Sequence, residues 1–221
     1  MTTRAVTNTI SVIGVIGSEK FSHESYGEKF YEYLVECERL SEATDVLPVI
    51  ISERIYDLSK LTIGTIIHVK GQIRTYEKYC PVKERTASEI AVFTKDLEVI
   101  PESSYEIKDN EDNDVFLEGK IGKPVVFRTT LNGYEISQIS LLVQRTFNNT
   151  DSIPCIVWGR NARYANTLKT GDVLRIWGRM QSRKYKKRFG EGENDVREKM
   201  TYEISVNKLE VLNGGEPSDA E

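Results

Sequence analysis

The sequence contains the same pattern twice, at an offset of roughly one hundred residues. The stretch GDVLRIWGRMQSRKY begins at Gly171, and the related stretch GTIIHVKGQIRTYEK begins at Gly64. The likeness continues on both sides, where NTISVIGVIG matches NDVFLEGKIG, TDVLPVIISER matches TDSIPCIVWGR and KDLEVI matches NKLEVL. A repeat of this length indicates a duplicated domain rather than an array of short units. The 221 residues therefore predict two related domains, because each copy is long enough to bury a core.

The composition of three segments predicts where these domains begin and end. Residues 101–114, PESSYEIKDNEDND, are polar and acidic, so we expect a linker between an N-terminal domain, 1–100, and a C-terminal domain, 115–212. The last stretch, 213–221, is Gly-rich and acidic and is expected to be disordered. No apolar run approaches the ~20 residues that a membrane span requires, and the N-terminus lacks the apolar core of a secretory signal. We therefore expect a cytoplasmic protein without membrane contact.

Runs of alternating polarity predict an all-β fold with short helices. In the second copy the expected strands are Val115–Ile121 (resumed at Val125–Thr129), Tyr134–Phe147, Ser152–Trp158, Asp172–Tyr185 and Lys199–Val211, with a helix at Asn161–Leu168. The first copy gives the same order of elements over Ile10–Ile16, Phe30–Cys37, Val46–Ile51, Ile55–Leu61 at the helix position, Ile66–Thr75 and Glu89–Val99. Five strands with one helix after the third predict an OB-fold. The expected fold class is therefore two tandem OB-folds, five-stranded Greek-key barrels that arose by internal duplication.

The two copies differ in charge. Residues 8–100 carry 11 Lys/Arg and 15 Asp/Glu, a net charge of −4, whereas residues 115–212 carry 17 Lys/Arg and 10 Asp/Glu, a net charge of +7. A basic domain is typical of proteins that bind polyanions, so the second domain is the expected nucleic-acid binder. The alternative is that charge simply scatters on small domains.

The expected fourth strand of the second copy places cations and aromatic rings on one face. Side chains alternate along a strand, so the apolar Leu174, Ile176 and Met180 face the core. The opposite face carries Arg175, Trp177, Arg179, Gln181, Arg183 and Tyr185. Proteins that bind single strands with little sequence preference combine cations for the phosphates with rings for the bases. The alternative is an Arg-rich solvated strand whose rings pack on a neighbour.

Trp158 extends this expected surface. It ends the third strand and opposes Cys155 and Val157, the core-facing pair, so its ring should point outward. Arg160 and Arg163 follow it, and an apolar ring beside two arginines suits base stacking with phosphate contacts. Burial of Trp158 in the core is the alternative interpretation.

A basic loop follows the fourth strand. It contains Lys184, Lys186, Lys187 and Arg188, followed by GEGEND. Such a loop could close over a bound strand, and Lys187 is the contact we expect from it. It could equally be a solvated surface loop.

The sequence offers no catalytic or metal-binding constellation. Its two histidines, His23 and His68, both lie in the first copy, and its three cysteines lack the CxxC spacing of a zinc site. No P-loop or GxGxxG occurs. The outward face of the expected fourth strand carries no carboxylate of the kind a nuclease would need. We therefore expect a protein that is not an enzyme and requires neither a metal nor a cofactor.

The segments LLVQRTF, DSIPCIVWGRNARYA, GDVLRIWGRMQSRKY and TYEISVNKLEVL resemble the bacterial single-stranded DNA-binding protein family. In that family, aromatic residues at the ends of strands two, three and four stack on DNA bases. By position these residues are Phe147, Trp158 and Tyr185. Alternation along the second strand would point Phe147 inward, whereas the resemblance implies that it points outward. The whole chain resembles a tandem-OB variant found in Gram-positive bacteria and their mobile elements.

The resemblance implies a non-enzymatic protein that binds single-stranded DNA in DNA replication, recombination or repair. It implies a cytoplasmic, nucleoid-associated location and replication or repair proteins as further partners. The usual family member has one barrel per chain, and a tetramer supplies four barrels. Two barrels per chain therefore imply a homodimer that supplies four OB-folds.

The first copy lacks most of these residues. Where the second copy has Trp158 and Tyr185, the first has Ser52 and Lys78. We interpret the first domain as an assembly or partner-binding module, with the aromatic stretch Phe30–Tyr33 as a candidate protein interface. Contact with nucleic acid stays open for Arg74, Tyr76 and Tyr79. The alternative function is a replication or restart accessory module that binds nucleic acid, DNA or RNA, only weakly.

Overall fold

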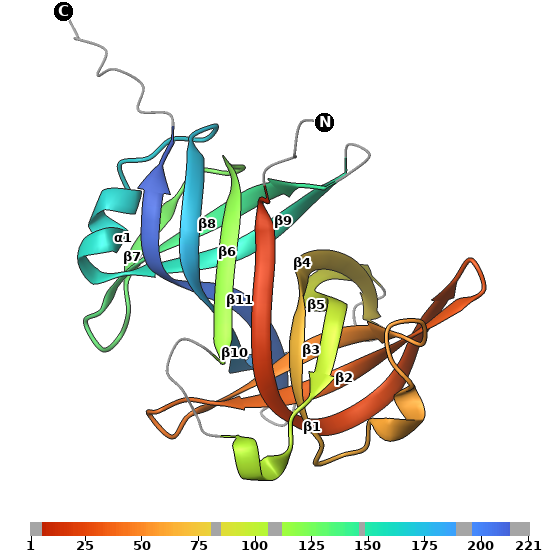
Figure 1. Ribbon diagram of the computed structural model, residues 1–221. Coiled ribbons are helices and arrows are strands. Elements are labelled where there is room, and N and C mark those ends of the chain that lie inside the picture. Colours follow the sequence, from red (N-terminus) through yellow and green to blue (C-terminus); the bar gives the residue numbers. More distant parts are fainter. Residues whose placement is uncertain (1–5, 81–84, 106–111, 146–148, 189–195, 213–221) are drawn as a thin grey trace, which may run out of the picture. The chain divides into compact units, whose positions relative to one another are not determined.

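The computed structural model describes residues 6–80, 85–105, 112–145, 149–188 and 196–212 (Figure 1). The chain forms two compact units. The N-terminal unit consists of Ile10–Asp114 together with Met180–Glu203. The C-terminal unit consists of Met1–Thr9, Val115–Arg179 and Ile204–Glu221. The domain boundaries expected from the sequence, at 100 and 114, remain a prediction.

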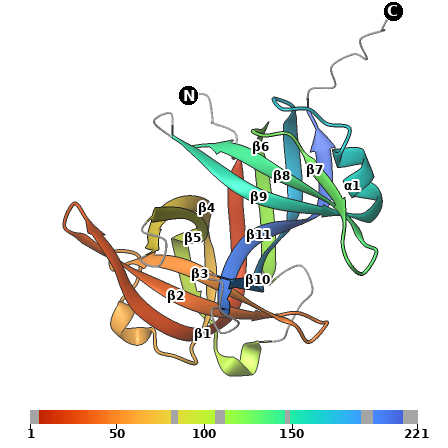
Figure 2. The ribbon, with the colours of Figure 1, turned by 180° about the vertical axis from the view of Figure 1, so that it is seen from behind.

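The N-terminal unit contains a closed ring of five strands. They are β1 (Asn8–Ser25), β2 (Glu28–Glu38), β3 (Thr44–Ser52), β4 (Ile66–Cys80) and β5 (Arg85–Val99). Their order is β2-β3-β5-β4-β1, and a further pairing of β2 with β1 closes the ring. Strands β3 and β5 are parallel, while the pairs β1–β2, β1–β4, β2–β3 and β4–β5 are antiparallel. Seen from behind, β2 and β3 run beside each other as their antiparallel register requires (Figure 2).

The second copy of the sequence repeats this connectivity. Its strands are β6 (Asn113–Ile121), β7 (Val126–Thr129), β8 (Glu135–Gln144), β9 (Thr150–Trp158), β10 (Val173–Arg188) and β11 (Val196–Val211). The order β6-β10-β11-β9-β8 is closed by a pairing of β6 with β8, and β9 and β11 form the parallel pair. Strand β7 is added to the open side of β8 by a turn in which Gly133 has a φ of 79°. The duplicated OB-fold expected from the sequence is confirmed.

The helix after β9 is shorter than the sequence suggested. It is α1 (Gly159–Ala165), whereas the spacing of apolar residues predicted 161–168. Gly159 takes a φ of 57° directly after β9, so the chain turns into the helix two residues before the expected start at residue 161. The Thr167 hydroxyl donates to the Tyr164 carbonyl at 2.7 Å, which bonds the last turn and ends the helix. The Ser137 hydroxyl donates to the Ala162 carbonyl at 2.7 Å and fixes α1 against β8 (Figure 1).

Two further segments differ from the sequence expectation. At the helix position of the first copy, 55–61, the structure has only the 3₁₀ turn η1 (Leu58–Lys60), whose N-cap Asp57 accepts a hydrogen bond from the Ser59 N–H. Within the expected acidic linker, the described residues include the 3₁₀ turn η3 (Glu102–Ser104). Strand β1 extends to Ser25, well past its expected end at Ile16, since it continues into a hairpin with β2. No helix of the described residues is long and apolar enough to cross a bilayer.

The core of each unit follows the alternation of its strands. In β10 the side chains of Leu174, Ile176 and Met180 are buried, whereas Arg175 and Trp177 are partly exposed. This periodicity sets which residues of β10 are available to a ligand.

Glycines at matching positions in the two copies allow neighbouring strands to approach closely. A Cβ at Gly178 would lie 2.1 Å from the Ser205 carbonyl oxygen, and one at Gly71 would lie 2.3 Å from the Phe93 carbonyl oxygen. Separations below 3.0 Å are essentially never seen for real Cβ atoms. Each glycine therefore lets the fourth and fifth strands of its ring lie against each other.

Candidate nucleic-acid interface

The indole of Trp158 stands at the end of β9 with 38% of its surface exposed. Its Nε1–H donates to the Ser205 hydroxyl on β11 at 3.2 Å. Strand β11 runs parallel to β9 at this point, with Ser205 opposite Ile156. The neighbouring strand thus fixes the polar edge of the ring, while part of its apolar surface is open to solvent. A ring held in this way suits stacking, because little side-chain freedom remains to be lost.

Trp177 lies on the outward face of β10 but is only partly exposed. Its ring centroid is 5.3 Å from that of Phe116, the residue opposite it on β6. The Lys208 ammonium on β11 lies 4.4 Å from the ring centroid, within the range of a cation–π interaction. Trp177 therefore packs between two neighbouring strands and exposes less ring surface than alternation alone implied.

Three of the expected phosphate-binding arginines are paired with carboxylates from other strands. The distances between the charged atoms are 2.5 Å for Arg163 and Glu135, 2.8 Å for Arg175 and Glu118, and 3.2 Å for Arg183 and Glu203. The Glu135 carboxylate raises the pKa of the Arg163 guanidinium, so that arginine stays charged. The outward face of β10 itself carries no acidic residue. The carboxylates beside its arginines come from neighbouring strands.

The remaining expected contacts divide between the two units. Arg160 is exposed on α1 and forms no ion pair with a described residue, and Arg179 is partly exposed on β10. Arg183 and Tyr185 belong to the N-terminal unit, where 40% of the Tyr185 surface is exposed. Phe147 and the side chain of Lys187 lie outside the described residues. The role of each of these residues in binding stays a prediction.

Two tyrosines of the N-terminal unit are packed within that unit: Tyr76, at the position equivalent to Arg183, and Tyr202 of β11. The Tyr76 hydroxyl donates to Glu32 at 3.3 Å, and burial together with the Glu32 and Glu89 charges raises the Tyr76 pKa far above its ordinary value. Tyr202 is partly buried, and its pKa is raised to about 12 by burial and by the same two carboxylates. Acid-lined tyrosines of this kind disfavour a phosphate, since the surrounding charge is negative.

In the aromatic stretch Phe30–Tyr33 at the start of β2, the second half is buried, and a role of this stretch as a protein interface stays a prediction. Tyr33 is inaccessible to solvent, and Glu32 is almost so, with its carboxylate 2.5 Å from the Lys20 ammonium. Alternation within β2 turns Tyr33 into the barrel core. Phe30 and Tyr31 are partly exposed; Phe30 stacks on His23 of β1, and Tyr31 meets Phe21 of β1 edge to face.

Sequence reasoning missed three residues that shape this surface. Ser205 fixes Trp158, and Phe116 and Lys208 flank Trp177. Each lies on a strand other than the one that carries the residue it contacts, so periodicity within a single strand could not identify it. Among the described residues, no three His, Cys, Asp or Glu side chains gather as ligands for a metal.

The fold and this surface together define a tandem OB-fold protein whose second barrel presents an exposed indole beside arginines. The resemblance expected from the sequence is confirmed for the second barrel, since residues 112–212 match the model of the single-strand binding protein family. The single-stranded DNA-binding protein of Bacillus cereus is 36% identical over 112 residues, which cover 47% of this chain and 63% of that protein. Single-stranded DNA-binding protein A of Bacillus subtilis is 36% identical over 110 residues, which cover 47% of this chain and 62% of that protein. The match thus spans slightly less than two thirds of these relatives.

A solved structure resembles the whole chain. The wild-type single-stranded DNA binding protein from Thermus aquaticus superposes with a TM-score of 0.72 at 17% sequence identity, covering 97% of this chain and 96% of that chain. A deletion mutant of the same protein gives a TM-score of 0.70, also at 17% identity. At this identity the likeness is one of fold, and it extends over both barrels.

Proposed function

We propose that this chain binds single-stranded DNA without catalysis, mainly through its second barrel. The observation that carries the proposal is the fixed, partly exposed indole of Trp158, which lies next to the arginines of α1. Bases would stack on Trp158, Trp177 and Tyr185, and arginines would contact the phosphates. The family match over residues 112–212 supports the same function.

The expected energetics agree with a binder of low sequence preference. Each stacked base contributes roughly 1–3 kcal/mol, and every base has a face on which a ring can stack. Each phosphate contact adds a salt-dependent contribution through release of counterions. The phosphate contacts in this proposal come from Arg160, Arg163, Arg175, Arg179 and Arg183, with Lys187 in the basic loop.

The wider setting of the protein is part of the proposal. We place it in DNA replication, recombination or repair, in the cytoplasm at the nucleoid, with proteins of those processes as further partners. A homodimer would bring four OB-folds together. The first barrel, whose tyrosines are acid-lined, would serve assembly or positioning rather than direct DNA contact.

Tryptophan fluorescence tests the proposal directly, because Trp158 and Trp177 are the two tryptophans of the chain. We expect strong quenching when oligo-dT is added, since bases stack on at least one indole. The quenching should weaken as salt rises, because phosphate contacts release counterions. A folded protein whose fluorescence and salt response do not change on titration would contradict the proposal.

A second candidate function is an accessory module that binds nucleic acid, DNA or RNA, only weakly. The ion pairs of Arg163, Arg175 and Arg183 favour it, since a phosphate must compete with a carboxylate at each of them. Micromolar binding of oligo-dT, with tight association to a helicase or recombinase, would favour this function over the first. Comparing oligo-dT with oligo-U would show whether the sugar matters.

The same ion pairs give a prediction about affinity. Glu118→Gln removes the carboxylate beside Arg175, so the guanidinium becomes free to contact a phosphate. We expect oligo-dT to bind about threefold more tightly at low salt, with a plot of log K against log salt steeper by about 0.7. Fluorescence titrations at several salt concentrations would measure both changes.

The matched control for this prediction is Glu98→Gln. It makes the same change in charge at an exposed position of the N-terminal unit. If Glu118→Gln and Glu98→Gln increase the affinity for oligo-dT equally, the effect comes from net charge and not from the release of Arg175.

A further inference from the structure

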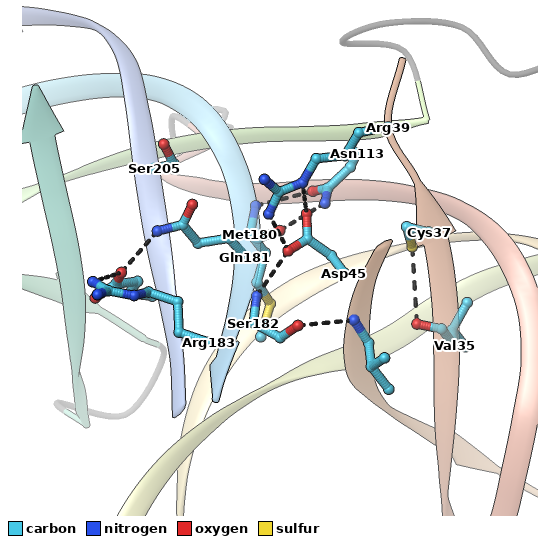
Figure 3. Close-up of polar contacts among 12 residues, drawn as sticks. Val35, Cys37, Arg39, Asp45, Asn113, Met180, Gln181, Ser182, Arg183 and Ser205 are labelled. Carbon is cyan, nitrogen blue, oxygen red and sulfur yellow. Dashed lines mark hydrogen bonds and ion pairs between the residues drawn. The ribbon is translucent and has the colours of Figure 1, made fainter. Parts of the chain in front are cut away.

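One buried carboxylate of the N-terminal unit fixes the segment that carries Arg183 and Tyr185 (Figure 3). We call the described residues of 180–188 and 196–203, at the end of β10 and the start of β11, the arm. Asp45 is the second residue of β3 and is 1% exposed. Its Oδ2 accepts from Arg39 Nε at 2.7 Å, and its Oδ1 accepts from Arg39 Nη2 and from the Ser182 N–H, the latter at 2.9 Å. The guanidinium compensates the buried charge and sets the direction of the carboxylate.

Ser182 forms a second hydrogen bond with strand β3. Its hydroxyl accepts from the Val46 N–H at 3.0 Å. Two consecutive residues of β3, Asp45 and Val46, thus hold the backbone and the side chain of one arm residue. A contact at two points restricts rotation of β10 as well as its displacement.

The residues on both sides of Ser182 are also held. The Asn113 side chain donates to the Met180 carbonyl at 2.7 Å and accepts from the Met180 N–H at 2.9 Å. Gln181 Nε2 donates to Glu203 at 2.7 Å, and Arg183 Nη1 donates to the same oxygen at 3.2 Å. Four successive residues of β10, Met180 to Arg183, are therefore fixed, and Tyr185, whose ring is partly exposed, follows two residues later.

We propose that Asp45 is a positioning residue for nucleic-acid binding: through Ser182 it holds the arm so that Arg183 and Tyr185 are presented to a single strand. This inference rests on the proposed function and adds a role for the first barrel, which supplies the anchor instead of a binding face. A fixed arm avoids the entropy that a free one would lose on binding. Asp45 itself touches no nucleic acid in this arrangement.

The anchor can be tested first without DNA, by limited digestion of the full-length protein with trypsin. Asp45→Ala removes the acceptor for Ser182, so we expect cleavage after Arg183 and Lys184 to become at least about fivefold faster. Thr44→Ala, at the exposed neighbouring position, should leave the rate unchanged. Ser182→Ala keeps the Arg39–Asp45 pair and loses only the bond from Val46, so it should accelerate cleavage even if Asp45→Ala does not fold. If neither Asp45→Ala nor Ser182→Ala changes the rate of cleavage, the proposal is overturned.

Affinity for oligo-dT then tests whether Asp45 acts through Arg183 and Tyr185, by comparing the effect of Asp45→Ala in proteins that lack either these two side chains or Trp158. Asp45→Ala should weaken binding about tenfold in the parent protein. The same change should have little effect once Arg183 and Tyr185 are both alanine, yet keep its full effect in a Trp158→Ala background. Equal losses in both backgrounds would indicate a general defect and overturn the positioning role. A parent protein that does not bind oligo-dT would overturn the proposed function. That outcome can be distinguished from failure of the anchor, because the digestion measures the anchor without DNA.

Discussion

Trp158→Ala should weaken binding of oligo-dT by roughly ten- to a hundredfold, because a stacked base contributes about 1–3 kcal/mol. The loss arises from removal of a ring that the Ser205 hydroxyl already holds in place. Trp158→Phe keeps a stacking surface but not the Nε1–H donor, so it should recover most of the affinity. Anisotropy of a labelled oligo-dT measures both variants without relying on the tryptophan signal.

The control for this prediction is another exposed ring. Tyr26 is fully exposed in the hairpin between β1 and β2, in the N-terminal unit. Tyr26→Ala should leave the affinity unchanged. A folded Trp158→Ala protein that binds as tightly as its parent would remove the central contact from the proposed site, and a comparable loss in Tyr26→Ala would show that the site is not confined to the second barrel.

Gly178→Ala should lower the free energy of unfolding by about 3 kcal/mol, at the upper end of the usual cost of overpacking. The new methyl group would lie 2.1 Å from the Ser205 carbonyl oxygen, so β10 and β11 would have to separate. The clashing atom belongs to the backbone and cannot rotate away. Urea unfolding followed by circular dichroism would measure the change.

Gly71→Ala provides the matched case in the other barrel, where the clash is with the Phe93 carbonyl. We expect a loss of similar size. Lys120→Ala, at an exposed position of β6, is the control and should change stability by less than about 0.5 kcal/mol. Gly178→Ala and Lys120→Ala proteins of equal stability would contradict the close approach of the two strands.

Much of the fold could be predicted because duplication and alternation are both properties of local sequence. Each copy carries the strand order of an OB-fold, and the burial of Leu174 and Ile176 follows from their spacing. The exposure of Trp158 follows from the burial of Cys155 and Val157 on the opposite face. These inferences need no knowledge of which strands pair.

The contacts between strands could not be predicted in the same way. Alternation shows that Arg175 faces outward, but only the register of β6 reveals that Glu118 lies opposite it. The anchoring of Ser182 by Asp45 depends on a contact between residues more than a hundred positions apart, which no local pattern contains. The pairing of strands therefore determines which arginines are neutralised by a carboxylate, and so determines the electrostatics of the candidate site.

One signal in the sequence could have revealed part of the anchor. Arg39 and Asp45 have the same spacing as Arg145 and Asp151 in the second copy, and each aspartate is the second residue of the third strand of its copy. The structure pairs each arginine with its aspartate, and both carboxylates are buried. An ion pair present in both copies, while the aromatic residues differ, indicates that the pair itself serves the fold of each barrel, whereas the bond from the Ser182 N–H is an additional role of Asp45.

The division of the chain into units also constrains how the protein is made. The N-terminal unit includes Met180–Glu203, which the ribosome adds long after Asp114 has emerged. During synthesis, all five strands of the first ring, β1 to β5, are therefore complete while Asp45 still lacks the backbone donor of Ser182. For the same reason, a gene divided after residue 114 would give an N-terminal fragment that lacks 180–203 and a C-terminal fragment whose arm has no anchor.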